Sequence, residues 1–107
     1  MTASTARAVA VAAVGDVPPG GVHAVTVEGR PVVLAELDGR LVAFDGACSH
    51  AGGPLGKGSI ADGRLQCPWH RATFDLRTGA PCAGPARKTL RRYPIRVEAG
   101  TVLVVLD

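Results

Sequence analysis

The chain has 107 residues, of which 47% are apolar and only 4% aromatic, and its formal net charge is +3. A chain of this length forms one domain that can bury its own core, and no apolar run approaches the ~20 residues that a membrane span requires. The charge is modest and basic residues are not interleaved with aromatic ones, so we expect neither a membrane nor a nucleic acid as partner.

The first apolar stretch, residues 6–14, predicts a strand. Val9, Val11 and Ala13 alternate with other residues, as the side chains of a half-buried strand do. A signal peptide would need a charged region before it and a longer apolar run. Three cysteines are also too few for a disulfide framework. We therefore expect the protein to be cytoplasmic.

Short strands separated by turn residues follow along the rest of the chain. Asp38-Gly39 is a strong signal for a two-residue hairpin, and Ala99-Gly100 separates a last pair of apolar runs. The strands that we expect are Val22–Val27, Pro31–Leu37, Arg40–Phe44, Ser59–Ile60, Arg64–Gln66, Thr73–Leu76, Tyr93–Glu98 and Thr101–Leu106. There is no convincing helix. This spacing indicates an all-β fold, an antiparallel sandwich or small barrel.

Two mixed pairs of metal-ligand residues interrupt this pattern. Cys48 and His50 form the first pair, and Cys67 and His70 form the second after a gap of sixteen residues. Two Cys and two His suit tetrahedral zinc by ligand type. Zinc modules, however, usually pair Cys with Cys and His with His. If each loop gives one ligand to each of two metals, one iron takes the two thiolates and the other takes the two imidazoles, as in a Rieske [2Fe–2S] centre.

These residues resemble the Rieske motif, Cys-x-His followed at a distance by Cys-x-x-His. The resemblance extends to residues that flank the ligands, namely Gly52, Gly53, Pro54, Leu55, Pro68, Trp69, Phe74 and Gly84-Pro85-Ala86. It implies a single Rieske domain over residues 1–107, with an antiparallel β-sandwich or barrel base. A small cluster-binding β subdomain of three strands would be inserted at about residues 46–86. Cys48, His50, Cys67 and His70 would hold one [2Fe–2S] cluster.

The resemblance further implies an electron carrier. Rieske oxygenases hold a second iron by two His and a carboxylate, whereas His23, expected on a strand surface, is the one histidine left over here. We therefore expect an electron-transfer component that is not itself an enzyme. It resembles the soluble ferredoxins that carry single electrons from a flavoprotein ferredoxin reductase to a terminal ring-hydroxylating oxygenase. Two alternatives stay open, a small Rieske subunit of a nitrite-reductase-like complex and a zinc-stabilised Cys2His2 binding module.

The subtype also follows from this resemblance. High-potential Rieske proteins have an extra Cys in each ligand loop, joined as a disulfide, and a Ser and a Tyr whose hydroxyls bond to sulfur. The corresponding positions here are Gly53, Trp69, Ala72 and Phe74. Because donors to sulfur stabilise the reduced state, their absence predicts a potential on the order of −150 mV.

Partner contacts are expected around the two histidine ligands. Four residues form the apolar docking rim that we expect there: Pro54, Leu55, Trp69 and Pro85. Several basic residues follow the last ligand, namely Arg71, Arg87, Lys88, Arg91, Arg92 and Arg96. They form either a solvated basic face or a surface that steers the acidic docking surface of a partner to the cluster end. Cys82 is expected to be a packed loop residue, because a cysteine that holds no metal behaves as a small hydrophobe. The alternative is a reactive thiol or a further metal ligand.

Overall fold

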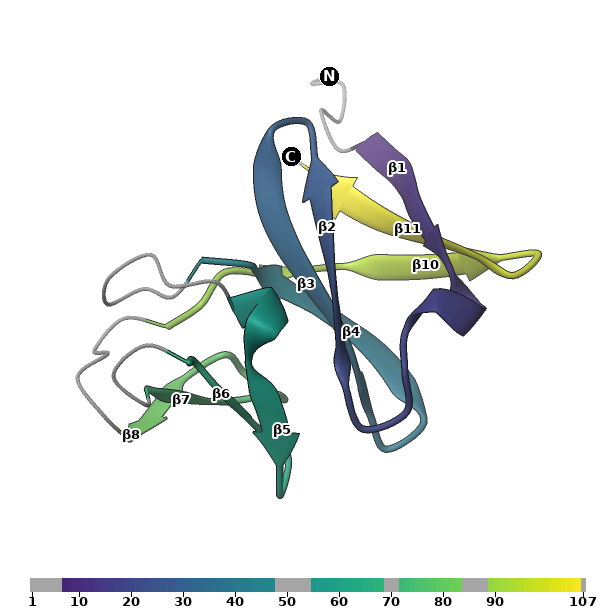
Figure 1. Cartoon of the computed structure of the whole chain (residues 1–107). Helices are drawn as coiled ribbons and strands as arrows, with labels where there is room; N and C mark the ends of the chain where they lie inside the picture. The colour runs from purple at the N-terminus through teal and green to yellow at the C-terminus, as the bar shows by residue number, and fades with distance from the viewer. Residues whose placement is uncertain (1–6, 48–54, 69–71, 84–88, 107) are drawn as a thin grey trace.

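The chain alternates short strands with tight turns, and the strands assemble into layers (Figure 1). The computed structural model describes residues 7–47, 55–68, 72–83 and 89–106. The described strands form three antiparallel sheets, with the orders β1-β11-β10, β2-β3-β4-β9 and β5-β6-β7-β8. Their bounds are β1 Arg7–Ala13, β2 Val22–Val27, β3 Arg30–Leu37, β4 Arg40–Asp45, β5 Ser59–Ala61, β6 Arg64–Gln66, β7 Thr73–Asp75, β8 Pro81–Ala83, β9 Arg92–Tyr93, β10 Ile95–Glu98 and β11 Thr101–Leu106. The predicted all-β sandwich class is confirmed.

Two-residue turns set the register of the hairpins. In the β3–β4 turn, Asp38 has φ 52° and Gly39 has φ 79°, and the β2–β3, β5–β6 and β10–β11 turns repeat this pair of positive angles. A turn with both central residues in the left-handed region matches the right-handed twist of the strands that it joins. Arg40 therefore lies opposite Leu37, and the ladder continues to Val32 opposite Asp45.

The sheet β2-β3-β4-β9 is the middle layer of the molecule, and it is buried on both faces. Val33, Val42 and Phe44 pack on one side, in a cluster with side chains from β6 and β7. Val32, Leu34 and Ala43 pack on the other side, against β10 and β11. Because successive side chains of a strand point to opposite faces, a strand buried on both sides has a continuous apolar run. β3 contains such a run, residues 32–35.

Two details differ from the sequence prediction. Tyr93–Glu98 is not one strand, because Pro94 lacks an N–H to continue a ladder. Tyr93 pairs with β4 in the middle sheet, and Ile95 pairs with β11 in the outer one. Pro81–Ala83 forms an additional strand, β8, so the sheet expected to have three strands has four.

Helical structure in the described residues is confined to two short 3-10 turns, η1 (Val14–Asp16) and η2 (Leu55–Lys57). Neither approaches the length of a membrane span, and no helix in the described part of the chain does.

Candidate metal centre

Four residues were predicted to bind the metal, and the described residues include one of them, Cys67. Cys67 lies immediately after β6. Its side chain is 0% exposed, in the cluster that contains Leu65, Ala72 and Phe74. The Cys67 N–H donates to the Ala72 carbonyl oxygen at 2.7 Å. This hydrogen bond joins the two ends of segment 68–71, so the second ligand loop begins and ends at a fixed point. His70 lies outside the described residues.

The first ligand loop is also closed by the backbone. Gly46 donates its N–H to the Pro31 carbonyl oxygen, and its own carbonyl oxygen accepts from the Leu55 N–H, each at 2.9 Å. A Cβ at Gly46 would lie 3.0 Å from the backbone of Pro31 and Val32, so a side chain there would push the strands apart. The chain thus leaves Gly46 and returns at Leu55 at one fixed point, between β3 and η2. Cys48 and His50 lie outside the described residues.

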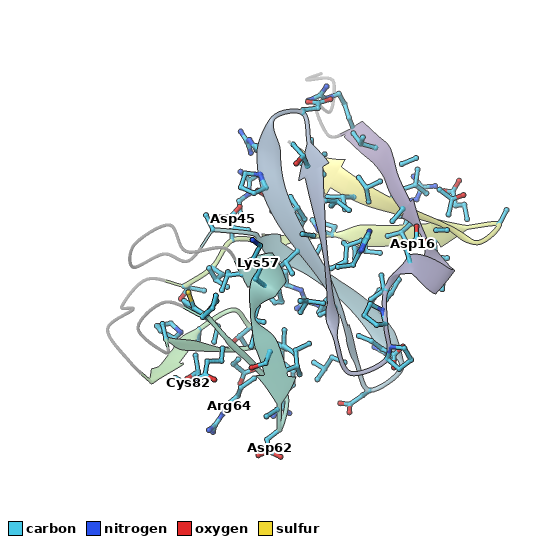
Figure 2. The ribbon with its side chains drawn as sticks, viewed as in Figure 1. Asp16, Asp45, Lys57, Asp62, Arg64 and Cys82 are labelled. Carbon is cyan, nitrogen blue, oxygen red and sulfur yellow. The ribbon has the colours of Figure 1, made fainter. Side chains whose placement is uncertain are left out.

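A side-chain hydrogen bond fixes the end of β4 from which this loop departs. The Tyr93 hydroxyl donates to Asp45 Oδ1 at 2.6 Å, and the Asp45 N–H donates to the Arg91 carbonyl oxygen at 3.0 Å. The Arg91 guanidinium lies 4.9 Å from the centre of the Tyr93 ring. Figure 2 labels Asp45 at the end of β4 and Lys57 at the end of η2. Sequence reasoning missed this pair, because residues 48 positions apart give no local signal.

The pKa of Tyr93 is raised above the ordinary value of 10.0. Burial of the ring is the largest cause, followed by the hydrogen bond to Asp45 and by the charge of that carboxylate. The guanidinium groups of Arg30 and Arg91 oppose the shift. Tyr93 therefore remains a neutral donor to Asp45 at every pH at which the protein is expected to work.

Leu55 does not belong to an exposed docking rim, contrary to our prediction. Its side chain is 0% exposed and lies in the same hydrophobic cluster as Cys67. The reason is that its backbone closes the first ligand loop, which turns the side chain into the space between the middle sheet and β6. The other three predicted rim residues, Pro54, Trp69 and Pro85, lie outside the described residues.

The prediction for Cys82 was also wrong. Cys82 lies in β8, at the edge of its sheet, and its thiol is exposed. The Sγ is 3.7 Å from the Ala80 carbonyl oxygen. His23 is half-buried on β2, as expected of a strand histidine.

Of the six basic residues predicted to face a partner, three lie in the described part of the chain. Arg91, Arg92 and Arg96 are exposed. Arg71, Arg87 and Lys88 lie outside the described residues, as does the loop Gly84-Pro85-Ala86.

The surroundings of Cys67 fit a metal-bound thiolate. A thiolate in an apolar cluster is unfavourable by itself, and coordination to a metal supplies the compensating charge. The neighbouring side chains of Ala72 and Phe74 are buried and carry no hydroxyl group. The sulfur would therefore receive no hydrogen bond from either of them.

Comparison with known proteins agrees with this geometry. Residues 7–94 match the family described as Rieske [2Fe-2S] domain. The chain is 32% identical over 92 residues to the ferredoxin component of the naphthalene 1,2-dioxygenase system of Pseudomonas aeruginosa, covering 86% of this chain and 88% of that protein. Among solved structures it is similar to the ferredoxin of carbazole 1,9a-dioxygenase from Nocardioides aromaticivorans IC177, with a TM-score of 0.84, 33% identity and coverage of 91% and 95%. It is also similar to a chain in a complex of reduced oxygenase and oxidised ferredoxin in carbazole 1,9a-dioxygenase, with a TM-score of 0.83, 26% identity and 91% of each chain covered.

Proposed function

The chain belongs to the Rieske [2Fe–2S] domain family, and we propose that it is the ferredoxin component of a ring-hydroxylating dioxygenase system. It carries single electrons from a flavoprotein reductase to a terminal oxygenase and is not itself an enzyme. The observation that carries this proposal is the similarity to dedicated ferredoxin components over nearly the whole of both chains.

Four residues of this chain would hold the cluster: Cys48, His50, Cys67 and His70. When bound, a cluster of this kind takes up and releases one electron at a time. The chain's own contribution is to keep the ligand loops in place. The bonds Cys67 N–H to Ala72 and Leu55 N–H to Gly46 close the two loops, and burial excludes water from the Cys67 sulfur.

The apolar contacts of Cys67 support a low reduction potential. Ala72 and Phe74 lie in the same cluster as Cys67, and neither side chain can donate a hydrogen bond to sulfur. We expect a potential on the order of −150 mV. Phe74→Tyr supplies a hydroxyl at a buried position and should raise the potential. A potential well above zero in the unmodified protein would contradict the subtype.

The function is tested with the purified holoprotein, a flavoprotein reductase and a terminal oxygenase. We expect equal amounts of iron and acid-labile sulfide, an axial electron paramagnetic resonance signal on one-electron reduction, and restored oxygenase turnover when the protein is added. A colourless protein with one zinc atom and no sulfide would instead identify a zinc-stabilised module. Stable co-purification with a large reductase would favour the subunit of a nitrite-reductase-like complex.

A further inference from the structure

The middle sheet has an open edge along the first half of β4. β9 pairs with β4 at Ala43 and Phe44, and the chain then leaves through Pro94 into β10 of the other sheet. On its other side β4 is paired with β3 along its whole length. Among the described residues, Arg40–Val42 therefore has a strand neighbour on one side only.

Backbone groups at this edge are available for pairing. The Asp45 N–H donates to Arg91 on the β9 side. In an antiparallel ladder every second residue directs its N–H and C=O to the same side. Ala43 and Leu41 therefore direct these groups to the same side as Asp45 does. Ala43 faces Tyr93, whereas Leu41 lies beyond the end of β9. Its N–H and C=O can pair with an added strand, as exposed strand edges do with extended peptides.

A depression lies on each face of this edge. One, of about 480 Å³, is lined by Leu37, Asp38, Arg40, Leu41, Val42, Arg77 and Arg92. The other, of about 440 Å³, shares Arg40, Leu41, Val42 and Arg92 with the first, and its further lining includes Val14, Pro94, Ile95 and Val97. Val14 and Val97 are 40% and 51% exposed, and they are the exposed large hydrophobic residues of the described chain. Arg77 and Asp38 border the first depression alone, whereas Val14 and Val97 border the second alone, so the first is the more charged of the two.

The first depression is strongly cationic. It contains three guanidinium groups and one carboxylate, that of Asp38. Arg92 Nη1 donates to the Arg77 carbonyl oxygen at 2.9 Å, which holds Arg92 over the turn after β7. Within the described residues neither Arg40 nor Arg92 forms an ion pair with a carboxylate, and Arg77 is 3.9 Å from Asp75. The charge of this face therefore favours an anionic occupant.

We propose that the open edge of β4 binds an extended acidic segment of a partner protein. The segment adds as a short strand beside Leu41. Its residue opposite Leu41 points to the same face as Leu41 and is apolar, to fill the depression next to Val97. The residues before and after it point to the opposite face and are Asp or Glu, to meet Arg40, Arg77 and Arg92.

This site lies at the far end of β4 from the ligand loops. Arg40 precedes Asp45 by five residues, about 17 Å along a strand. A segment bound here holds the partner while the ligand end stays open to electron exchange. The idea that the segment holds a redox partner rests on the proposed function. Binding of the segment itself does not depend on that function.

The test uses isotope-labelled holoprotein and the synthetic peptide acetyl-Ser-Glu-Val-Glu-Ser-amide, titrated by NMR. We expect saturable shifts centred on the Leu41 amide. Arg40→Glu should weaken binding by about tenfold, because it reverses a charge that faces the peptide. Lys57→Glu makes the same charge change on η2 and should bind as the unmodified protein does. A peptide methylated at the valine nitrogen should bind roughly fivefold more weakly, because one backbone hydrogen bond is lost.

Several outcomes would overturn the proposal. They are equal binding by the Arg40→Glu protein, equal binding of the scrambled peptide acetyl-Ser-Val-Glu-Glu-Ser-amide, or shifts confined to the ligand end. A dimer through this edge, seen by sedimentation and lost in Arg40→Glu, would assign the edge to a second copy instead. None of these measurements uses a redox partner, so failure of the electron-carrier function would leave the peptide result unchanged.

Discussion

The two hydrophobic clusters on either side of the middle sheet are held by different kinds of structure. The base cluster lies between the middle sheet and the β1-β11-β10 sheet, where the strands that cover it, β1 and β11, have seven and six residues. The ligand-side cluster lies under β5, β6, β7 and β8, each of three residues. Strands so short make few ladder hydrogen bonds. The half of the molecule that contains β5–β8 must therefore depend on side chains of the middle sheet and, by our proposal, on the [2Fe–2S] cluster that its loops would hold.

Removal of the iron should have the largest effect on the difference in stability between the two clusters. With the proposed ligands, the cluster would join loops that three-residue strands hold only weakly, and a metal site adds its binding free energy to folding. We expect hydrogen exchange of residues 59–66 and 72–83 to speed up by at least about a hundredfold in the apoprotein, while β11 keeps its protection. Mass spectrometry of exchanged fragments measures both halves in one sample. Equal loss in β11 would show that the two halves unfold as one unit.

A matched pair of core substitutions sharpens the comparison. Leu65 and Leu34 are both 0% exposed, one in the ligand-side cluster and one in the base cluster. Each change to Ala leaves a cavity and should cost about 2–5 kcal/mol in unfolding free energy. Leu65→Ala should also speed loss of the visible absorbance of the holoprotein.

Leu34→Ala should lower the global unfolding midpoint without such loss below that midpoint. Similar rates of absorbance loss in the two variants would contradict the separation. Chemical denaturation and the decay of the visible band are followed on the same samples.

The sequence predicted the local features well because their causes are local. The pair Asp38-Gly39 forms the hairpin that its composition indicates, and most strand bounds agree within one residue. What the sequence could not show depends on distant partners. Leu55 is buried because Gly46 accepts its N–H, and Tyr93 donates to Asp45 from another strand. Of the four predicted ligands, the structure describes Cys67, and its burial in an apolar cluster was not evident from the Cys-x-x-His spacing.

Tyr93→Phe should have an intermediate effect, with a pH dependence of known sign. Loss of the hydrogen bond to Asp45 should cost about 0.5–1.5 kcal/mol at neutral pH. The raised pKa of Tyr93 means that the folded state keeps its proton above pH 10.0, where the unfolded chain loses it. Tyr93 thus stabilises the fold below that pH, and this contribution is lost as the pH rises through the folded-state pKa. Denaturation at pH 7, 10 and 11 measures it.

In the Tyr93→Phe variant, the part of the decrease in unfolding free energy at alkaline pH that comes from Tyr93 should be absent. A parallel fall in both proteins would assign the loss to other groups. Because Asp45 leads into the first ligand loop, the variant should also release its cluster faster than the unmodified protein does.

The smallest effect is expected at the far end of the base. Arg7 on β1 and Glu28 in the β2–β3 turn form a two-pronged ion pair, with Nη1 to Oε2 at 2.7 Å, and their side chains are 56% and 42% exposed. Exposed pairs contribute about 0.2–1 kcal/mol, and salt screens them. A double-mutant cycle with Arg7→Gln and Glu28→Gln should give a coupling in that range at low salt and near zero at 1 M salt.

The rate of cluster release should be the same in all four proteins of that cycle. The pair ties β1 to the turn before β3, and the middle sheet separates this contact from the ligand-side cluster. A change in the release rate would mean that the edge of the base and the ligand loops are coupled through the middle sheet. The two halves would then not be independent.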